Sequence, residues 1–332
     1  MKQNVIYFLL SLSLLMVFSC KGKQSLTKDE MTDSVATAGP VFMEDSAYEY
    51  CAKQCAFGPR IMNSVAHDNC GKWIVDKFRS FGLDVIEQKA ELRGYDDTPL
   101  NATNIIAQYK PEAERRVIVC AHWDARPWAD NDPDEKNHKT PIDAANDGAS
   151  GVGVMLEIAR LLQTDTLSYG VDFICFDAED WGLPTWATWF DGVSEGTWSL
   201  GSQYWGNHLH KEGYKAEYGI LLDMVGGIGA QFLLEQGSTE YAPEPQKLVW
   251  EAARTAGYSG FFPMEKGGSV IDDHLSVCAY AGIPCVDVIP CFWDGYRSSF
   301  GPTWHTVNDN MQNLSKETLK AVGQTIVQVL YQ

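Results

Sequence analysis

Short apolar runs alternate along this chain with segments in which apolar residues recur at helical spacing. The apolar runs cover residues 117–120, 171–176, 220–222 and 285–289. The helix-like segments cover approximately residues 69–81, 151–163, 203–210, 245–256 and 315–331. Continuous apolar runs that alternate with helices are typical of strands that are buried on both faces. The pattern therefore predicts an α/β fold with a largely parallel, buried sheet.

The amino terminus has the pattern of an export signal. Residues 1–19 place a single lysine before an apolar run that is short for a membrane span, as in a secretory signal peptide. Residues Val17-Phe18-Ser19-Cys20 resemble a bacterial lipobox, in which the cysteine becomes the lipidated first residue of the mature protein. The alternative is an ordinary cleaved signal followed by an incidental cysteine. We expect a lipid anchor at Cys20 and a protein of the bacterial cell envelope that faces the periplasm.

The domain organisation follows from the composition of the next segments. Residues 20–40 are polar apart from the cysteine, lack apolar periodicity, and are typical of a flexible tether. Residues 41–332 contain no internal repeat, no low-complexity run and no second linker. We therefore expect one catalytic α/β domain over residues 41–332.

Charge and cysteine content narrow the possible partners. The chain has 44 acidic and 26 basic residues and a formal charge of −18, which argues against nucleic acid as a partner. A negative surface favours cationic ligands such as peptide amino termini, although solubility alone explains many of these charges. Cys120 and Cys175 lie inside apolar runs, where we expect buried free thiols rather than disulfide partners.

Ionisable residues follow the ends of the predicted strands. His122 and Asp124 follow the first apolar run, Glu179 and Asp180 follow the second, and Asp223 follows the third. In open α/β sheets, ligands bind beyond the carboxyl ends of the strands, so we expect these side chains to gather at one edge. Further candidates come from loops elsewhere in the chain, namely Asp147, Asp272 and His305.

Aspartate, glutamate and histidine side chains from several loops are typical of a catalytic zinc site, which uses three protein ligands and keeps one position open. Each pair alone has a simpler interpretation. His122 with Asp124 can be a hydrogen-bonded pair at a strand end, Glu179 with Asp180 can cap a helix, and Asp147 before a glycine can form a turn. Their joint placement favours the metal site.

The candidate residues lie within six short motifs along the chain. The motifs are Ala121-His122-Trp123-Asp124, Ala145-Asn146-Asp147-Gly148-Ala149-Ser150-Gly151, Phe176-Asp177-Ala178-Glu179-Asp180, Leu222-Asp223-Met224, Asp272-Asp273-His274 and Trp304-His305-Thr306. In this order, they resemble the bacterial members of the animal-type glutaminyl-peptide cyclotransferases, which lie within the M28 family of zinc aminopeptidases. The resemblance runs from about Phe57 to the carboxyl terminus. It implies a three-layer α/β/α fold around a mostly parallel, mixed central sheet.

The resemblance implies one zinc ion per chain, with Asp147, Asp180 and His305 as its ligands and Glu179 as the general acid and base. The chain departs from the family pattern at position 180, where the animal enzymes have glutamate. The metal ligand is therefore one methylene shorter in this chain.

The remaining roles also come from the resemblance. Asp223 and Asp272 belong to a catalytic network of hydrogen-bonded carboxyl groups beside the substrate, and Trp304 and Phe300 form the wall of the substrate pocket. Asp287 lies at the far end of this network and contributes to substrate binding. Animal cyclases commonly have histidine at that position, which makes this end of the network the least certain part of the match.

The implied reaction converts the N-terminal glutamine of a peptide or protein to pyroglutamate with release of ammonia. The alternative within the family is a two-zinc aminopeptidase, in which His122, Asp147 and Asp223 hold a second metal ion. A third possibility is an envelope receptor that keeps the fold but only binds peptides or sugars. The intact Glu179 argues against a receptor, because a binding module has no use for a placed acid and base.

Overall fold

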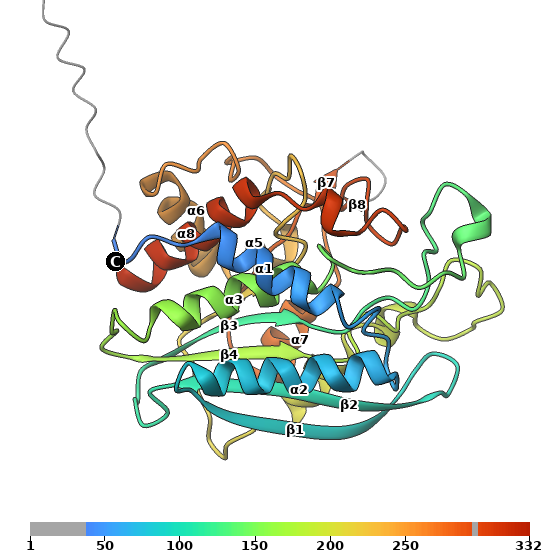
Figure 1. Ribbon diagram of the computed structural model, residues 1–332, viewed down its shortest axis with the longest axis horizontal. Helices are drawn as coiled ribbons and strands as arrows, with labels where there is room; N and C mark the ends of the chain where they lie inside the picture. Colours follow the sequence, from blue (N-terminus) through green and yellow to red (C-terminus); the bar gives the residue numbers. More distant parts are fainter. Residues whose placement is uncertain (1–37, 294–297) are drawn as a thin grey trace, which may run out of the picture. The chain divides into compact units, whose positions relative to one another are not determined.

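The computed structural model describes residues 38–293 and 298–332. Within these ranges, a six-stranded sheet has the strand order β1-β2-β4-β3-β5-β6 (Figure 1). The four strands from β4 to β6 in this order are parallel, whereas β1 and β2 form an antiparallel hairpin that pairs antiparallel with β4. The strands are β1 (Asp84–Arg93), β2 (Pro99–Tyr109), β3 (Arg116–His122), β4 (Gly170–Phe176), β5 (Gly219–Leu222) and β6 (Cys285–Val288). A separate small hairpin joins β7 (Phe292–Trp293) to β8 (Ser298–Ser299).

Helices cover both faces of the sheet (Figure 1). One face carries α1 (Glu44–Cys55), α2 (Val65–Ser80), α3 (Ala149–Leu161), α6 (Pro243–Thr255) and α8 (Lys316–Tyr331). The other face carries α4 (Leu200–Asn207) and α7 (Asp273–Ser276), and the latter continues into a π-helical turn at Val277–Ala281. The short helix α5 (Gln236–Tyr241) precedes α6. None of the helices in the described ranges has the length and apolar character needed to cross a bilayer.

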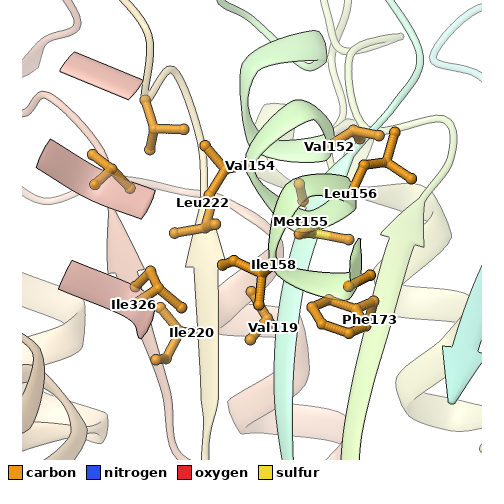
Figure 2. Packing of buried hydrophobic residues seen from close by; sticks show 14 of the residues in the cluster. Val119, Val152, Val154, Met155, Leu156, Ile158, Phe173, Ile220, Leu222 and Ile326 are labelled. Carbon is orange, nitrogen blue, oxygen red and sulfur yellow. The ribbon is translucent and has the colours of Figure 1, made fainter. Parts of the chain in front are cut away.

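The central strands are apolar throughout because each one faces two cores. Along β3, Val117 and Val119 point into the core beneath α3, whereas Ile118 and Cys120 point into the core beneath α4. Figure 2 shows the first of these cores, where Ile158 of α3 lies among side chains of the sheet and of α8. Strands of this kind lack a polar face, which explains the unbroken apolar runs in the sequence.

The sequence-based prediction of the fold class is confirmed, since a mixed and mostly parallel sheet lies between two helical layers. Cys120 and Cys175 are buried free thiols, as predicted, and every cysteine of the described ranges is free. The prediction missed α1 and the hairpin of β1 and β2. The residues of β1 alternate between exposed and half-buried positions, so this edge strand has no apolar run to reveal it. Cys20, the predicted signal peptide and residues 20–37 of the predicted tether lie outside the described residues.

A buried ion pair fixes the end of the sheet opposite the candidate site. Asp172 of β4 accepts hydrogen bonds from Arg116 Nε at 2.7 Å, Gln108 Nε2 at 3.0 Å and the Tyr214 hydroxyl at 2.6 Å. Removing the charge of Asp172 leaves a buried guanidinium without its counterion, which typically costs about 3–5 kcal/mol. We expect Asp172→Asn to lower the free energy of unfolding by about this amount in urea titrations. Tyr214→Phe, which removes one neutral donor, should lower it by only about 1 kcal/mol. Equal stability of Asp172→Asn and the parent protein would contradict this assignment.

Candidate active site

The carboxyl ends of three parallel strands deliver the candidate side chains to one edge of the sheet, as expected. His122 is the last residue of β3, Glu179 and Asp180 lie in the turn after β4, and Asp223 directly follows β5. All four side chains are buried or nearly so.

Asp147, Asp180 and His305 come together as a compact cluster, with one potential ligand atom of each within 4.8 Å of the others. His305 Nε2 lies 3.5 Å from Asp147 Oδ2 and 3.2 Å from Asp180 Oδ1. These oxygens and Asp180 Oδ2 are buried without a hydrogen-bond partner among the described residues. Buried carboxylate oxygens are normally hydrogen-bonded or bound to a cation. Two carboxylates and one imidazole form a donor set that suits zinc, so the residues present fit the implied metal.

His305 is held from its other side by residues that were not identified from the sequence. Its Nδ1 lies 3.5 Å from Asp130 Oδ1, and Arg126 clamps that carboxylate at 3.0 Å and 2.7 Å. Arg126 also donates to the carbonyl oxygen of Asp180 at 3.0 Å. A carboxylate on the outer nitrogen of a histidine fixes the orientation of the ring and presents its other nitrogen to a metal.

Two further carboxylates hold the turns that carry the cluster. Asp124 accepts the backbone N–H groups of Glu179 and Asp180, each at 3.1 Å. Asp309 accepts the backbone N–H groups of Asn146 at 2.7 Å and Asp147 at 2.9 Å. Asp124 therefore has a wider role than the predicted pairing with a neighbouring histidine, and Asp309 had no motif of its own to indicate its role.

Left-handed backbone is concentrated around these turns. Ala144, Ala178, Ser199, Met224 and His305 have φ angles of 52°, 53°, 53°, 51° and 54°, respectively. A non-glycine residue in this conformation is held there by its surroundings at a cost of about 1–2 kcal/mol. The turns that aim the candidate side chains are therefore shaped by the packed structure rather than by local preference.

A cavity of about 250 Å³ opens beside the cluster, and its lining includes Glu179, Asp223, Asp272, Phe300 and Trp304. The Trp304 ring packs on the His305 ring at 4.1 Å and on the Phe300 ring at 4.6 Å between centroids. Trp198 stacks on His305 at 5.9 Å with an interplanar angle of 9°. The predicted wall residues thus line the cavity, and Trp198 joins them.

Other aromatic residues of the same region have different positions. Trp205 is fully buried under the sheet and packs against Phe176 at 5.8 Å. Trp186 packs on Trp128 at 5.7 Å, and Trp189 is 67% exposed. None of these side chains is among the described residues that line the cavity. Trp205 therefore belongs to the packed core, whereas Trp198 lines the cavity.

Glu179 has the surroundings of a proton carrier. Its Oε1 accepts a hydrogen bond from the Ser199 hydroxyl at 3.1 Å. Burial, with a smaller contribution from the charges of Asp180 and Asp272, raises the pKa of Glu179 well above its ordinary value. Burial also raises the pKa of Asp223 and, more strongly, that of Asp272. The cavity therefore contains carboxyl groups that hold protons more readily than exposed ones, as is common for groups that transfer protons.

A second cluster of potential metal ligands shares Asp147 with the first. His122 Nε2 lies 3.0 Å from Asp147 Oδ1 and 3.3 Å from Asp223 Oδ1, and these three residues also have ligand atoms within 4.8 Å of one another. Asp124 approaches the other ring nitrogen of His122 at 3.4 Å. The geometry therefore leaves open the two-metal arrangement of the alternative function.

Asp287 lies behind the cavity wall rather than on it. It is fully buried in β6, and its carboxyl group approaches that of Asp272, which is on the wall. His274 is also fully buried, with Nδ1 at 3.4 Å from Asp287 Oδ2. Asp287 is thus connected to the cavity only through other side chains, and His274 joins the acidic group that the sequence placed around Asp272.

Comparison with known proteins places these features in a family context. The family model described as peptidase family M28 matches residues 104–330. The curated protein Aminopeptidase YwaD of Bacillus subtilis (strain 168) is 30% identical over 256 residues, which cover 74% of this chain. The chain spans about half the length of that relative, 48%.

Solved structures match over nearly their whole length. A glutaminyl cyclase of Bacteroides thetaiotaomicron, bound to N-acetylhistamine, is 50% identical with a TM-score of 0.85, and the match covers 88% of this chain and 99% of that chain. A structure described as a leucine aminopeptidase precursor from Bacteroides thetaiotaomicron VPI-5482 is 50% identical with a TM-score of 0.84, covering 89% and 99%. A glutaminyl cyclase of Tannerella forsythia is 47% identical with a TM-score of 0.84, covering 88% and 99%.

Proposed function

The chain belongs to peptidase family M28, and we propose that it is a zinc-dependent glutaminyl-peptide cyclotransferase that converts N-terminal glutamine to pyroglutamate. The observation that carries the proposal is one small aromatic-walled cavity, in which Glu179 and Asp272 lie beside the cluster of Asp147, Asp180 and His305. The likeness to the bacterial glutaminyl cyclases supports it further.

The family and its zinc-dependent members imply a zinc site, and we assign it to Asp147, Asp180 and His305 with one ion per chain. The unpartnered carboxylate oxygens of this cluster support the assignment. When bound, zinc supplies a Lewis acid for the γ-carbonyl oxygen of the substrate glutamine. Asp130 and Arg126 keep His305 and Asp180 oriented toward the site.

Glu179 moves the proton that the reaction must transfer. The α-amino nitrogen forms a bond with the γ-carbonyl carbon, and the bond from that carbon to the side-chain nitrogen breaks. Glu179 accepts a proton from the attacking amine and returns it to the departing nitrogen, which leaves as ammonia. A buried carboxyl group with a raised pKa suits both steps, because it binds a proton more readily than an exposed glutamate.

Positioning supplies much of the remaining catalysis, because the attack is intramolecular. Asp223 and Asp272 line the cavity and accept hydrogen bonds from the substrate amine. Trp304 and Phe300 form the apolar wall against which the glutamine side chain folds back toward its own amine. A small cavity favours this curled shape and excludes water, which limits competing hydrolysis.

The second cluster makes a two-zinc aminopeptidase the alternative function. His122 Nε2 lies 3.3 Å from Asp223 Oδ1, and the ligand atoms of both residues lie within 4.8 Å of one of Asp147. A second metal ion that shares Asp147 with the first would need such an arrangement. Incubation with Gln-Xaa and Leu-Xaa peptides separates the two functions. A cyclase releases ammonia and a pyroglutamyl peptide from the first substrate and leaves the second intact. Release of free leucine together with about two zinc ions per chain would overturn the proposal in favour of the peptidase.

We also propose that the protein is lipid-anchored at Cys20 in the bacterial cell envelope and faces the periplasm. The lipobox-like sequence before this residue supports the anchor. Because a covalently attached acyl chain provides the membrane affinity, Cys20→Ala should move the protein from the membrane fraction to the soluble periplasmic fraction. Unchanged fractionation of this variant would count against the anchor.

A further inference from the structure

A line of buried ionisable side chains leads away from the cavity, behind Asp272. It continues through Asp287 of β6 and His274 of α7 to Glu235, which precedes α5, and these last three side chains are fully buried. We propose that Glu235 and His274 are positioning residues for cyclisation: Glu235 orients the His274 ring, and His274 holds the carboxyl pair of Asp287 and Asp272 toward the substrate. The inference rests on the proposed function, since it assigns these residues to that reaction.

His274 lies between two carboxyl groups, one beside each ring nitrogen. Its Nε2 lies 3.4 Å from Glu235 Oε2, and its Nδ1 lies 3.4 Å from Asp287 Oδ2. Neither nitrogen has another hydrogen-bond partner among the described residues. The ring is therefore placed to connect Glu235 on one side with Asp287 on the other.

Glu235 is itself held in place by backbone groups. Its two oxygens accept backbone N–H groups of Gly237 at 2.7 Å, Ser238 at 2.5 Å and Val270 at 3.0 Å. Burial opposes a charge there, but His274 and these N–H groups lower the pKa of Glu235 to about 2. Glu235 is therefore a firmly held anion at neutral pH, and the His274 ring is oriented against it.

Asp272 and Asp287 lie together beside His274. A ligand atom of Asp272 lies within 4.8 Å of those of His274 and Asp287. Burial raises the pKa of Asp272 and Asp287 well above the usual range, and the neighbouring Asp272 further raises that of Asp287. Cys291 is also nearby, but burial raises the pKa of its thiol to about 12, so it stays neutral. His274 thus connects Glu235 with the two aspartates, the nearer of which to the cavity is Asp272.

Glu235 also acts on the cavity wall directly. The backbone N–H group of Val270 donates to Glu235, and Val270 lies two residues before Asp272. Val270 and Asp272 both line the cavity. The same carboxylate thus fixes the backbone of the wall and the ring of His274 behind it. A change at Glu235 should therefore reach the substrate by two routes, whereas a change at His274 should act mainly through the carboxyl pair.

The kinetic role is tested with His274→Gln and Glu235→Gln, and Glu240→Gln on the exposed face of α5 serves as the matched control. We expect His274→Gln to lower kcat about 10- to 100-fold, as for other residues that orient catalytic groups, with KM and zinc content nearly unchanged. The pH dependence of kcat should shift as well, because the ionisation of the carboxyl pair changes. Glu235→Gln should reduce kcat in the same direction, and Glu240→Gln should match the parent protein.

The outcomes separate a positioning role from a merely structural one. A folded His274→Gln variant with the parent kcat and pH profile would overturn the proposal, even if its melting temperature were lower. Loss of a second equivalent of bound zinc in His274→Gln would also overturn it, because Asp272, His274 and Asp287 would then be metal ligands. If the parent protein releases no ammonia from N-terminal glutamine peptides, the proposed function fails. If the parent protein is active and a folded His274→Gln variant matches it, only the positioning role fails.

Discussion

Replacing Glu179 by glutamine should lower the turnover of an N-terminal glutamine peptide by about 10²- to 10⁴-fold while the bound zinc is retained. The substitution keeps the size of the side chain and an oxygen for the Ser199 hydroxyl, but it removes the group that accepts and returns the proton. The adjacent Asp180 keeps its position because its backbone N–H is held by Asp124. Ammonia release measures turnover, and metal analysis of the purified variant measures zinc.

Glu251→Gln is a suitable control, since Glu251 is an exposed residue of α6 on a different part of the surface. It should have the turnover of the parent protein. If Glu179→Gln stays active, the assignment of the acid and base is wrong. If it loses zinc together with activity, Glu179 contributes to the metal site and its role in proton transfer is not established.

Loss of the metal ion should have an effect of similar size. Polarisation of the γ-carbonyl group is worth several kcal/mol, so a chelator should reduce turnover by on the order of 10³-fold. Stoichiometric zinc should restore it. His305→Ala removes the only imidazole of the three-residue cluster, and we expect it to bind zinc weakly and to stay inactive at the zinc concentration that restores the parent protein.

His208→Ala provides the comparison for this variant, because His208 is exposed and lies far along the chain from the cluster. It should retain both zinc and activity. Full activity of the parent protein after exhaustive chelation would refute the zinc dependence. One recovered zinc ion per chain at full activity would favour the cyclase over the two-zinc alternative.

Much of the fold was predictable because the central strands are buried on both sides. A strand with two apolar faces leaves an unbroken apolar run, and β3, β4, β5 and β6 were each found in this way. The edge strand β1 was missed because its positions are exposed or half-buried, so its few apolar side chains form no continuous run. Helix boundaries differed by a few residues, as for α2, which begins at Val65 rather than near residue 69.

The candidate site was predictable where a side chain directly follows a strand or belongs to a motif, as for Glu179 and Asp223. The supporting residues were not predictable in this way. Asp130 and Asp309 reach the cluster from loops, and only the tertiary structure shows what their carboxylates contact. His274 belongs to a motif, but its fully buried position between two carboxyl groups is visible only in the fold.

The left-handed residues around the site have a consequence for heat resistance. The left-handed conformation costs about 5–10 kcal/mol of folding free energy in total over five residues, which is comparable to the net stability of an ordinary domain. These residues are Ala144, Ala178, Ser199, Met224 and His305. Glycine adopts this conformation without strain, so Ala144→Gly is a place to look for a more heat-resistant protein. Glycine is not an option at His305 or Ser199, because it would remove the imidazole of the cluster or the hydroxyl that donates to Glu179. The temperature at which the protein unfolds is therefore partly set by residues of the candidate active site.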